Sequence, residues 1–287
     1  MTFANQTPTI AMTGATAGLG LATSHLLAGR GAHLVLLVWH PDKAAAVADN
    51  AMRAGASGVD IIACDLSLMS SVRQAAADLA ALGTPVDVII NDAAVVTPSR
   101  ALTDEGNEAM LATNYLGPCL LTRLALGGLP SGHPVKLITV GGPLSDKPDL
   151  DDLDCARSFS VRTAFERSKT ALNLFTAAVP RYAGNIAPRA VVYSPGLMKT
   201  NLSATIAGSM AQVVGTLATK VLPNPSERAG TLAQLATSTN LDDAAPGTLF
   251  NSKGEASPMP LIDDVELQDQ LWRLTSERLG LPADGLV

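Results

Sequence analysis

The sequence predicts an α/β fold in which a doubly wound parallel sheet is covered by helices on both faces. Short apolar runs of strand length alternate with longer stretches of helical period along almost the whole chain. The strand-like runs are unbroken rather than alternating, as a sheet buried on both faces requires. The chain has 287 residues and is 47% hydrophobic, which suits one large domain over residues 1–287.

The strands and helices follow one another in strict order. Six buried strands are expected at Thr9–Met12, Leu34–Val38, Val59–Ala63, Val86–Ile90, Val135–Val140 and Ala190–Tyr193, and a shorter one at Thr248–Asn251. Helices are expected at Leu19–Arg30, Asp42–Ala54, Met69–Leu82, Asn107–Leu129 and Arg162–Ala183, with a last one at about 264–279. This alternation implies crossover connections between parallel strands of one sheet.

Two irregular segments should border the ligand. Gly141–Ser160 is rich in Pro and Asp, and residues 200–225 are rich in small side chains. Both follow strand ends, and ligands of open α/β sheets bind outside the carboxyl ends of the strands. The second segment is therefore expected to be a lid that follows the sixth strand.

Composition excludes several classes of function. A net charge of −6 without a Lys or Arg run argues against nucleic acid or an anionic membrane as partner. Cys64, Cys119 and Cys155 are widely spaced, so they are expected to be reduced core thiols rather than metal ligands. No apolar run has the length of a membrane span and residues 1–8 do not resemble a signal peptide, so a cytoplasmic location is expected. The oligomeric state is left open.

Three glycines stand between the first strand and the first helix. Gly14, Gly18 and Gly20 would allow a tight turn and the close approach of a pyrophosphate. The N-terminus of the helix supplies N–H donors and the positive end of its dipole. A purely structural turn also uses glycine, but the strand before and the helix after favour a dinucleotide.

Together with further motifs, this loop resembles the short-chain dehydrogenase/reductases, a Rossmann-type family. The motifs are the loop from Thr13 to Gly20, Asp65, Asn91-Asp92-Ala93-Ala94, Asn114 and Pro195-Gly196. Asp151-Asp152-Leu153 and the run from Ser194 to Thr200 are most similar to the retinol-dehydrogenase and protochlorophyllide-reductase branch. The similarity extends over almost the whole chain.

The resemblance implies a nicotinamide dinucleotide site along the carboxyl edge of the sheet. Its residues would be Gly14, Thr16, Gly18, Leu19, Gly20, Asp65, Leu66, Asn91, Ala93, Lys169, Pro195, Gly196, Met198 and Thr200. Asp65 would bond the adenine, Asn91 would line the adenosine ribose with Ala93, and Lys169 would bond the nicotinamide ribose. Taken alone, Asp65 could equally be a turn or cap residue, and Asn91 a strand-end tie.

The end of the second strand favours NADPH as the cofactor, with NADH also accepted. An NAD enzyme usually carries an acid there for the ribose 2′-hydroxyl, and an NADP enzyme an arginine nearby. This chain has Trp39 and His40 instead. His40 or Lys43 could approach a 2′-phosphate, and Trp39 could stack on the adenine or simply pack.

The catalytic hydroxyls that the family resemblance implies are missing. A serine should follow the fifth strand, and a tyrosine should stand four residues before Lys169. These positions are Gly142 and Phe165, whereas Asn114 and Lys169 remain as catalytic residues. Other conceivable acids are better explained as loop or packing residues, namely Ser145, Asp146, Tyr115 and Tyr193.

The preferred hypothesis is an NAD(P)H-dependent ketoreductase whose proton comes from the substrate or from water. An activated ketone, bonded internally to a neighbouring phenol, stabilises its own developing alkoxide. The chain resembles the atypical ketoreductases that tailor aromatic polyketides of the angucyclinone type in antibiotic biosynthesis. The flat substrate would lie against Gly142, Pro143, Ser145, Phe165, Tyr193 and Met198. The alternatives are a non-redox cyclase or isomerase and a non-enzymatic dinucleotide-binding protein.

Overall fold

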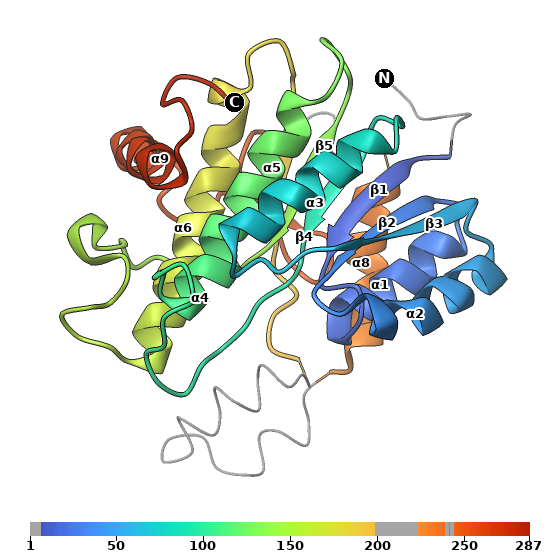
Figure 1. The fold of residues 1–287 in the computed structure, drawn as a ribbon, viewed down its shortest axis with the longest axis horizontal. Helices are drawn as coiled ribbons and strands as arrows, with labels where there is room; N and C mark the ends of the chain where they lie inside the picture. The colour runs from blue at the N-terminus through green and yellow to red at the C-terminus, as the bar shows by residue number, and fades with distance from the viewer. Residues whose placement is uncertain (1–6, 199–222, 239–240, 242–243) are drawn as a thin grey trace.

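A single twisted sheet forms the centre of the molecule (Figure 1). The computed structural model describes residues 7–198, 223–238, 241 and 244–287. The sheet has the strand order β3-β2-β1-β4-β5-β6-β7-β8, in which only the pairing of β7 with β8 is antiparallel. The order reverses direction at β1, which is the mark of a doubly wound sheet. The predicted fold class is confirmed.

The strands lie close to their predicted positions. They are β1 (Thr9–Thr13), β2 (His33–Val38), β3 (Gly58–Ala63), β4 (Val88–Asn91), β5 (Lys136–Val140), β6 (Arg189–Tyr193), β7 (Thr248–Phe250) and β8 (Ala256–Ser257). The larger helices are α1 (Gly18–Ala28), α2 (Pro41–Ala54), α3 (Met69–Ala81), α5 (Gly117–Gly127), α6 (Val161–Tyr182), α8 (Pro225–Thr237) and α9 (Val265–Leu279). Both faces of the central strands are buried, which explains their unbroken apolar sequences.

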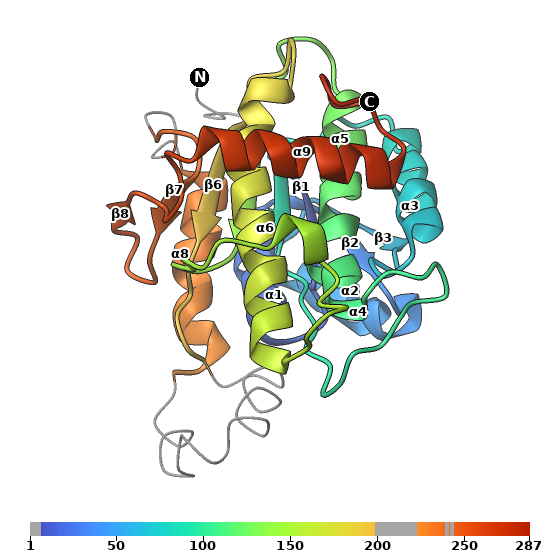
Figure 2. The same ribbon diagram turned by 90° about the vertical axis from the view of Figure 1, so that its left-hand side faces the viewer.

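Helices cover the two faces of the sheet in separate groups. Helices α3, α5 and α6 lie on one face, and α1, α2 and α8 on the other (Figure 1). Helix α9 crosses over α5 and α6 as an outer layer (Figure 2). Its Trp272 is 2% exposed and stacks on Tyr182 with ring centroids 4.2 Å apart, while the guanidinium of Arg123 lies 4.5 Å from the indole. Arg123 also donates to the backbone carbonyls of Pro282, Gly285 and Leu286, which fixes the C-terminal segment.

Several elements differ from the sequence expectation, among them strand β8 and the 3₁₀ turn Leu150–Asp152, which were not predicted. The predicted helix Asn107–Leu129 is a short α4 (Ala109–Leu111), a π turn (Ala112–Leu116) and then α5. Helix α8 was not predicted at all. Its first turn is closed by a capping box, in which the side chains of Asn224 and Glu227 satisfy each other's backbone N–H groups.

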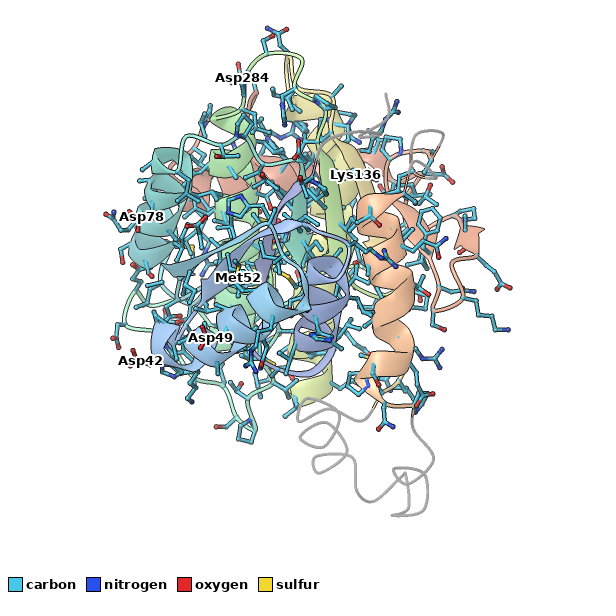
Figure 3. All side chains as sticks on the ribbon, turned by 90° about the vertical axis from the view of Figure 1, so that its right-hand side faces the viewer. Asp42, Asp49, Met52, Asp78, Lys136 and Asp284 are labelled. Atoms are coloured by element: carbon cyan, nitrogen blue, oxygen red, sulfur yellow. The ribbon has the colours of Figure 1, made fainter. Side chains whose placement is uncertain are left out.

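Lys136 of β5 fixes the C-terminal end of α8. Figure 3 labels Lys136 beside this helix. Its ammonium is 3% exposed and donates to the carbonyls of Ala236 at 3.2 Å and Ser238 at 2.5 Å. A cation is favourable there because the last carbonyls of a helix carry the negative end of its dipole.

The expected lid lies almost entirely outside the described residues. Within the described part of the chain, no helix is both long enough and apolar enough to span a bilayer.

Candidate active site

The turn between β1 and α1 is shaped for close contact with a ligand. Gly14 has φ +75°, and a Cβ there would lie 2.8 Å from the backbone nitrogen of Ala93. A Cβ on Gly20 would lie 2.3 Å from the carbonyl oxygen of Gly14. Helix α1 begins after Ala17, whose side chain makes no capping hydrogen bond. The glycines therefore let the turn pack closely against the chain at Ala93 and Asp92, and the N-terminus of α1, where the Gly20 N–H is bonded to the Asp92 carboxylate, stays the predicted place of a pyrophosphate.

The other predicted residues of this loop are Gly18, Leu19 and Thr16. Gly18 also has a positive φ, of +53°. Leu19 is buried in the core beneath the first turn of α1, so only its backbone can contact a ligand. Thr16 is half-buried within the loop.

The adenosine end of the site lies past β2 and β3. Trp39 is 68% exposed and stacks on His40 with ring centroids 4.3 Å apart. The Trp39 ring is thus not packed in the core, and its stacking on an adenine stays a prediction. The Oδ1 of Asp65 accepts from the N–H and the hydroxyl of Ser67, at 2.9 and 2.6 Å. Asp65 thus closes a turn with Ser67, its contact with the adenine stays a prediction, and the side chain of Leu66 is buried.

The side chain of Asn91 does not line this site. It is 1% exposed, and its Nδ2 donates to Thr122 Oγ1 at 3.0 Å. The strand-end tie is therefore the correct explanation for this side chain, because the amide ties β4 to α5. The backbone of Ala93 faces the glycine loop, and its N–H donates to Thr13 Oγ1 at 3.2 Å.

The nicotinamide end follows β6. Pro195 is buried, and Gly196 is exposed with φ +71°. Met198 is half-buried against the core between the sheet and α8. Thr200 lies outside the described residues, so its predicted contact stays a prediction.

The position of the missing serine is open space. A Cβ on Gly142 would meet no atom within 4 Å. A Cβ on Gly141 would lie 2.1 Å from Oδ1 of Asn173, whose Nδ2 donates to the carbonyl of Gly142 at 2.9 Å. Only Gly142 can accept a side chain, which agrees with its assignment as the vacant serine position. Phe165 is half-buried and packs against a small cluster of Met110, Cys155 and Ala164.

Asn114 lies in the π turn, a feature that is frequent at functional sites. Its Oδ1 accepts from the N–H of Val95 at 2.8 Å, and its Nδ2 donates to the carbonyl of Val95 at 3.0 Å and to Ser168 Oγ at 3.2 Å. The side chain is fully buried. Asn114 therefore holds the loop after β4 against α6.

Lys169 is 5% exposed, and its Nζ donates to the carbonyl oxygen of Val140 at 2.6 Å. Burial lowers the pKa of Lys169 to about 8, against the opposing effect of the nearby Asp92 carboxylate. Burial also raises the pKa of Asp92 to about 7, whereas Lys169 and the N–H of Gly20 lower it. Asp92 was not predicted as a functional residue, although it stands inside the Asn91-Asp92-Ala93-Ala94 motif.

The tyrosines considered as replacement acids are engaged elsewhere. Tyr193 is fully buried, and its hydroxyl donates to the carbonyl of Arg228 on α8 at 2.7 Å. The prediction that Tyr193 lines the substrate is therefore wrong. Tyr115 is also fully buried, with its hydroxyl 2.6 Å from Thr275 Oγ1. Burial raises the pKa of both phenols, that of Tyr193 to about 12.

The loop after the vacant serine position faces solvent. Pro143, Ser145 and Asp146 are exposed. The three residues lie one to four positions after Gly142 in the chain. Ser145 and Pro143 can meet a substrate from the outside of the site.

Comparison with known proteins shows the family of the chain. A family model described as short chain dehydrogenase matches residues 8–210. The chain belongs to the short-chain dehydrogenase family. It is 31% identical over 271 residues to the polyprenol dehydrogenase of Mus musculus, covering 91% of this chain and 80% of that protein. The prediction of an oxidoreductase is confirmed at the level of the family.

Solved structures give the same result for the fold. A crystal structure of an uncharacterized protein from Mycobacterium paratuberculosis is 26% identical, with a TM-score of 0.69 and 98% of both chains covered. An NAD(P)-dependent gluconate 5-dehydrogenase from Beutenbergia cavernae is 22% identical, with a TM-score of 0.66, and covers 88% of this chain and 97% of that one. The second structure contains bound NADP.

Proposed function

We propose that the chain is an NAD(P)H-dependent ketoreductase that reduces an activated ketone on a flat aromatic polyketide. The substrate would be an angucyclinone such as those tailored in simocyclinone biosynthesis, an antibiotic pathway. NADPH is the preferred cofactor, and NADH is also accepted, because neither an acid nor an arginine follows β2 at Trp39 and His40. A bound nicotinamide dinucleotide would supply the hydride.

The observation that carries the proposal is the contrast between two parts of the site. The chain carries residues suited to a dinucleotide, namely the glycine turn after β1, the exposed Trp39 after β2 and the buried Lys169, whose Nζ donates to the last residue of β5. The serine and tyrosine positions instead hold Gly142, with open space around it, and the apolar ring of Phe165. Such a site can aim a hydride but gives no phenol to protonate the product.

The chain's own residues then have distinct tasks. Asn114 holds the loop after β4, and Lys169 would bond the ribose beside the nicotinamide. Gly142 and Phe165 leave room and an apolar wall for a planar ring system. A ketone hydrogen-bonded to its own neighbouring phenol needs no acid from the protein, because the phenol proton stabilises the alkoxide as it forms. Water is the other source of the proton.

The test is reduction itself. Purified protein is mixed with NADPH and a panel of aromatic polyketide ketones, and both the loss of NADPH absorbance and the product mass are followed. Reduction requires one NADPH consumed per ketone, with a gain of two mass units in the product. The same ketones without NADPH are the control.

Two other outcomes would contradict the proposal. A changed product without loss of NADPH would indicate a cyclase or isomerase that keeps the dinucleotide as a structural part. Tight binding of NADPH without any ketone-dependent oxidation would indicate a non-enzymatic dinucleotide-binding protein.

A further inference from the structure

Arg278, in the last turn of α9, has no task in the proposed reaction, although it bonds to two loops that leave the carboxyl edge of the sheet. The first loop, residues 92–108, follows β4, and the second, residues 141–160, follows β5. Ligands of doubly wound sheets bind outside this edge. Helix α9 lies on the same side of the molecule as the yellow-green second loop (Figure 1).

The guanidinium of Arg278 makes two hydrogen bonds to each loop. Its Nη1 and Nη2 donate to the two carboxylate oxygens of Asp154, at 2.7 and 2.8 Å. Its Nε and Nη2 donate to Oδ1 of Asn107, at 3.0 and 2.8 Å. Burial raises the pKa of Asp154, but hydrogen bonds and the charge of Arg278 outweigh it and hold this pKa below its ordinary value. The bidentate pair fixes the orientation of both side chains, because a carboxylate matches the fork of a guanidinium.

Asp154 of the second loop also bonds directly to the first. Its Oδ1 accepts from the backbone N–H of Glu108 at 3.3 Å, and its backbone carbonyl accepts from Nε of Arg100 at 3.1 Å. The side chains of Arg278 and Asp154 are 28% and 27% exposed. A single ion pair at such exposure contributes little to stability, whereas a bidentate pair within a network of bonds contributes more.

Other anchors hold each loop separately. Lys147 of the second loop pairs with Asp264, the N-cap residue of α9, at 2.5 Å, and Arg167 of α6 bonds to the same loop. Glu105 of the first loop accepts from two backbone N–H groups in the first turn of α3. These contacts fix each loop on a helix, whereas Arg278 fixes one loop relative to the other.

The segments that this guanidinium holds lead directly into the apolar cluster against which Phe165 packs. Met110 follows Asn107 by three positions, and Cys155 follows Asp154 directly. Met110 and Cys155 are fully buried in the same small cluster, and the half-buried ring of Phe165 packs against it. A shift of one loop relative to the other would therefore displace the side chains on which this ring rests.

We propose that Arg278 is a positioning residue that holds the two loops together and thereby keeps the apolar side of the substrate space in shape for a flat ring. The inference rests on the proposed function in taking the ring of Phe165 as a wall of that space. Arg278 acts through Asn107 and Asp154 rather than on the reacting atoms.

The first test needs no substrate. Hydrogen–deuterium exchange of the ligand-free protein is followed by mass spectrometry in the wild type and in Arg278→Gln. Peptides that cover residues 101–111 and 153–158 should exchange about tenfold faster in the variant, because hydrogen bonds to charged groups resist local opening. Unchanged exchange in both peptides would overturn the proposal.

The second test uses the flat polyketide ketone. In Arg278→Gln the KM for the ketone should rise about tenfold, while kcat and the Kd for NADPH stay within about twofold. General destabilisation would instead lower the active fraction, and with it kcat, without raising KM. Arg278→Lys keeps the charge but cannot form the bidentate pair, so its KM should lie between those of the wild type and Arg278→Gln. An unchanged KM in Arg278→Gln would also overturn the proposal.

Arg181→Gln is the matched control. Arg181 of α6 pairs with Asp269 of α9 at 2.8 Å, with side chains 37% and 32% exposed, and also donates to Oε1 of Gln268. Within the described residues these bonds go to α9 and not to either loop. Arg181→Gln should therefore destabilise the protein in urea about as much as Arg278→Gln, but leave loop exchange and KM unchanged. Equal changes in loop exchange and KM in the two variants would mean that Arg278 only stabilises α9.

Asp154→Asn tests the same contact from its other side and covers the case in which Arg278→Gln does not fold. It should show the same changes, and the double variant should raise KM no further than either single variant, because both remove one interaction. A KM rise in the double variant equal to the product of the two single rises would contradict the contact.

Failure of this inference can be distinguished from failure of the proposed function. A wild type that reduces no ketone would overturn the proposed function, and the exchange experiment would then decide whether Arg278 holds the two loops together. Unchanged loop exchange with ketone reduction intact would overturn this inference alone.

Discussion

Restoring the two missing hydroxyls should distinguish two cases. In one, the enzyme is slow because it lacks a general acid, and in the other the substrate supplies the proton. The double variant is Gly142→Ser with Phe165→Tyr. The serine side chain fits because a Cβ at Gly142 meets nothing within 4 Å. The tyrosine adds one hydroxyl to a half-buried ring that already packs beside Met110. General acid catalysis contributes about 10²–10⁴-fold, or about 3–5.5 kcal/mol of barrier.

The gain should depend on the ketone. For a simple aryl ketone without a neighbouring phenol, kcat/KM of the double variant should rise about 10²-fold or more. For the phenol-bearing polyketide ketone it should rise less than about tenfold, because the substrate already provides the proton. Steady-state NADPH oxidation measures both. A rise of about 10²-fold or more with the phenol-bearing ketone would refute the reasoning.

A neighbouring glycine provides the control for this experiment. A Cβ on Gly141 would lie 2.1 Å from Oδ1 of Asn173 and 2.8 Å from Val192. Gly141→Ser should therefore lose about 1–3 kcal/mol of unfolding free energy through overpacking. It should give no gain with either ketone. A gain from Gly141→Ser would mean that the serine position had been assigned to the wrong glycine.

Four further variants, one of them a control, test single features of the structure. Gly14→Ala should weaken NADPH binding at least about tenfold by calorimetry, because a Cβ would strike the backbone of Ala93 at 2.8 Å and the residue has a positive φ. Gly83→Ala is the control, because Gly83 has φ +69° but open space around it, so this variant should show only the small cost of alanine at a positive φ. An equal loss of NADPH binding in both variants would contradict the role of Gly14 in the glycine turn. Trp272→Ala should cost about 3–5 kcal/mol of unfolding free energy in urea, since its ring is fully packed between α6 and α9, and a cost below about 1 kcal/mol would contradict this packing. Tyr193→Phe should keep kcat within about twofold and cost about 1 kcal/mol of stability, whereas a large fall in kcat would restore Tyr193 as a candidate acid.

The sheet was predictable because its strands are buried on both faces. Leu34–Val38 and Val135–Val140 are continuous apolar runs, and the structure places β2 and β5 within one residue of them. The π turn Ala112–Leu116 had no such signal, because it continues the apolar helical pattern of its neighbours. Helix α8 was not predicted because small residues weaken its apolar period and the segment before it was interpreted as a lid.

The errors in the site also concern contacts and side-chain directions that the sequence does not show. The hydroxyl of Tyr193 donates to the carbonyl of Arg228. Arg228 lies on α8, which was not predicted, so the sequence could not identify this partner of Tyr193. The buried side chain of Asn91 ends a strand with four buried residues, where alternation gives no direction. The assignment of Gly142 and Phe165 as the vacant serine and tyrosine positions stays a prediction from the sequence, in which Lys169 sets the register for Phe165.

The most direct test of the central claim uses NADPH carrying deuterium at the transferred position and a pair of polyketide ketones. The pair differs only in the neighbouring phenol, which is free in one and methylated in the other. The product mass reports whether deuterium has been transferred. The account predicts fast labelling of the ketone with the free phenol and labelling of the methylated ketone that is slower by about 10²-fold or more. Equal labelling of both would contradict substrate-supplied protonation, and labelling of neither would contradict ketone reduction.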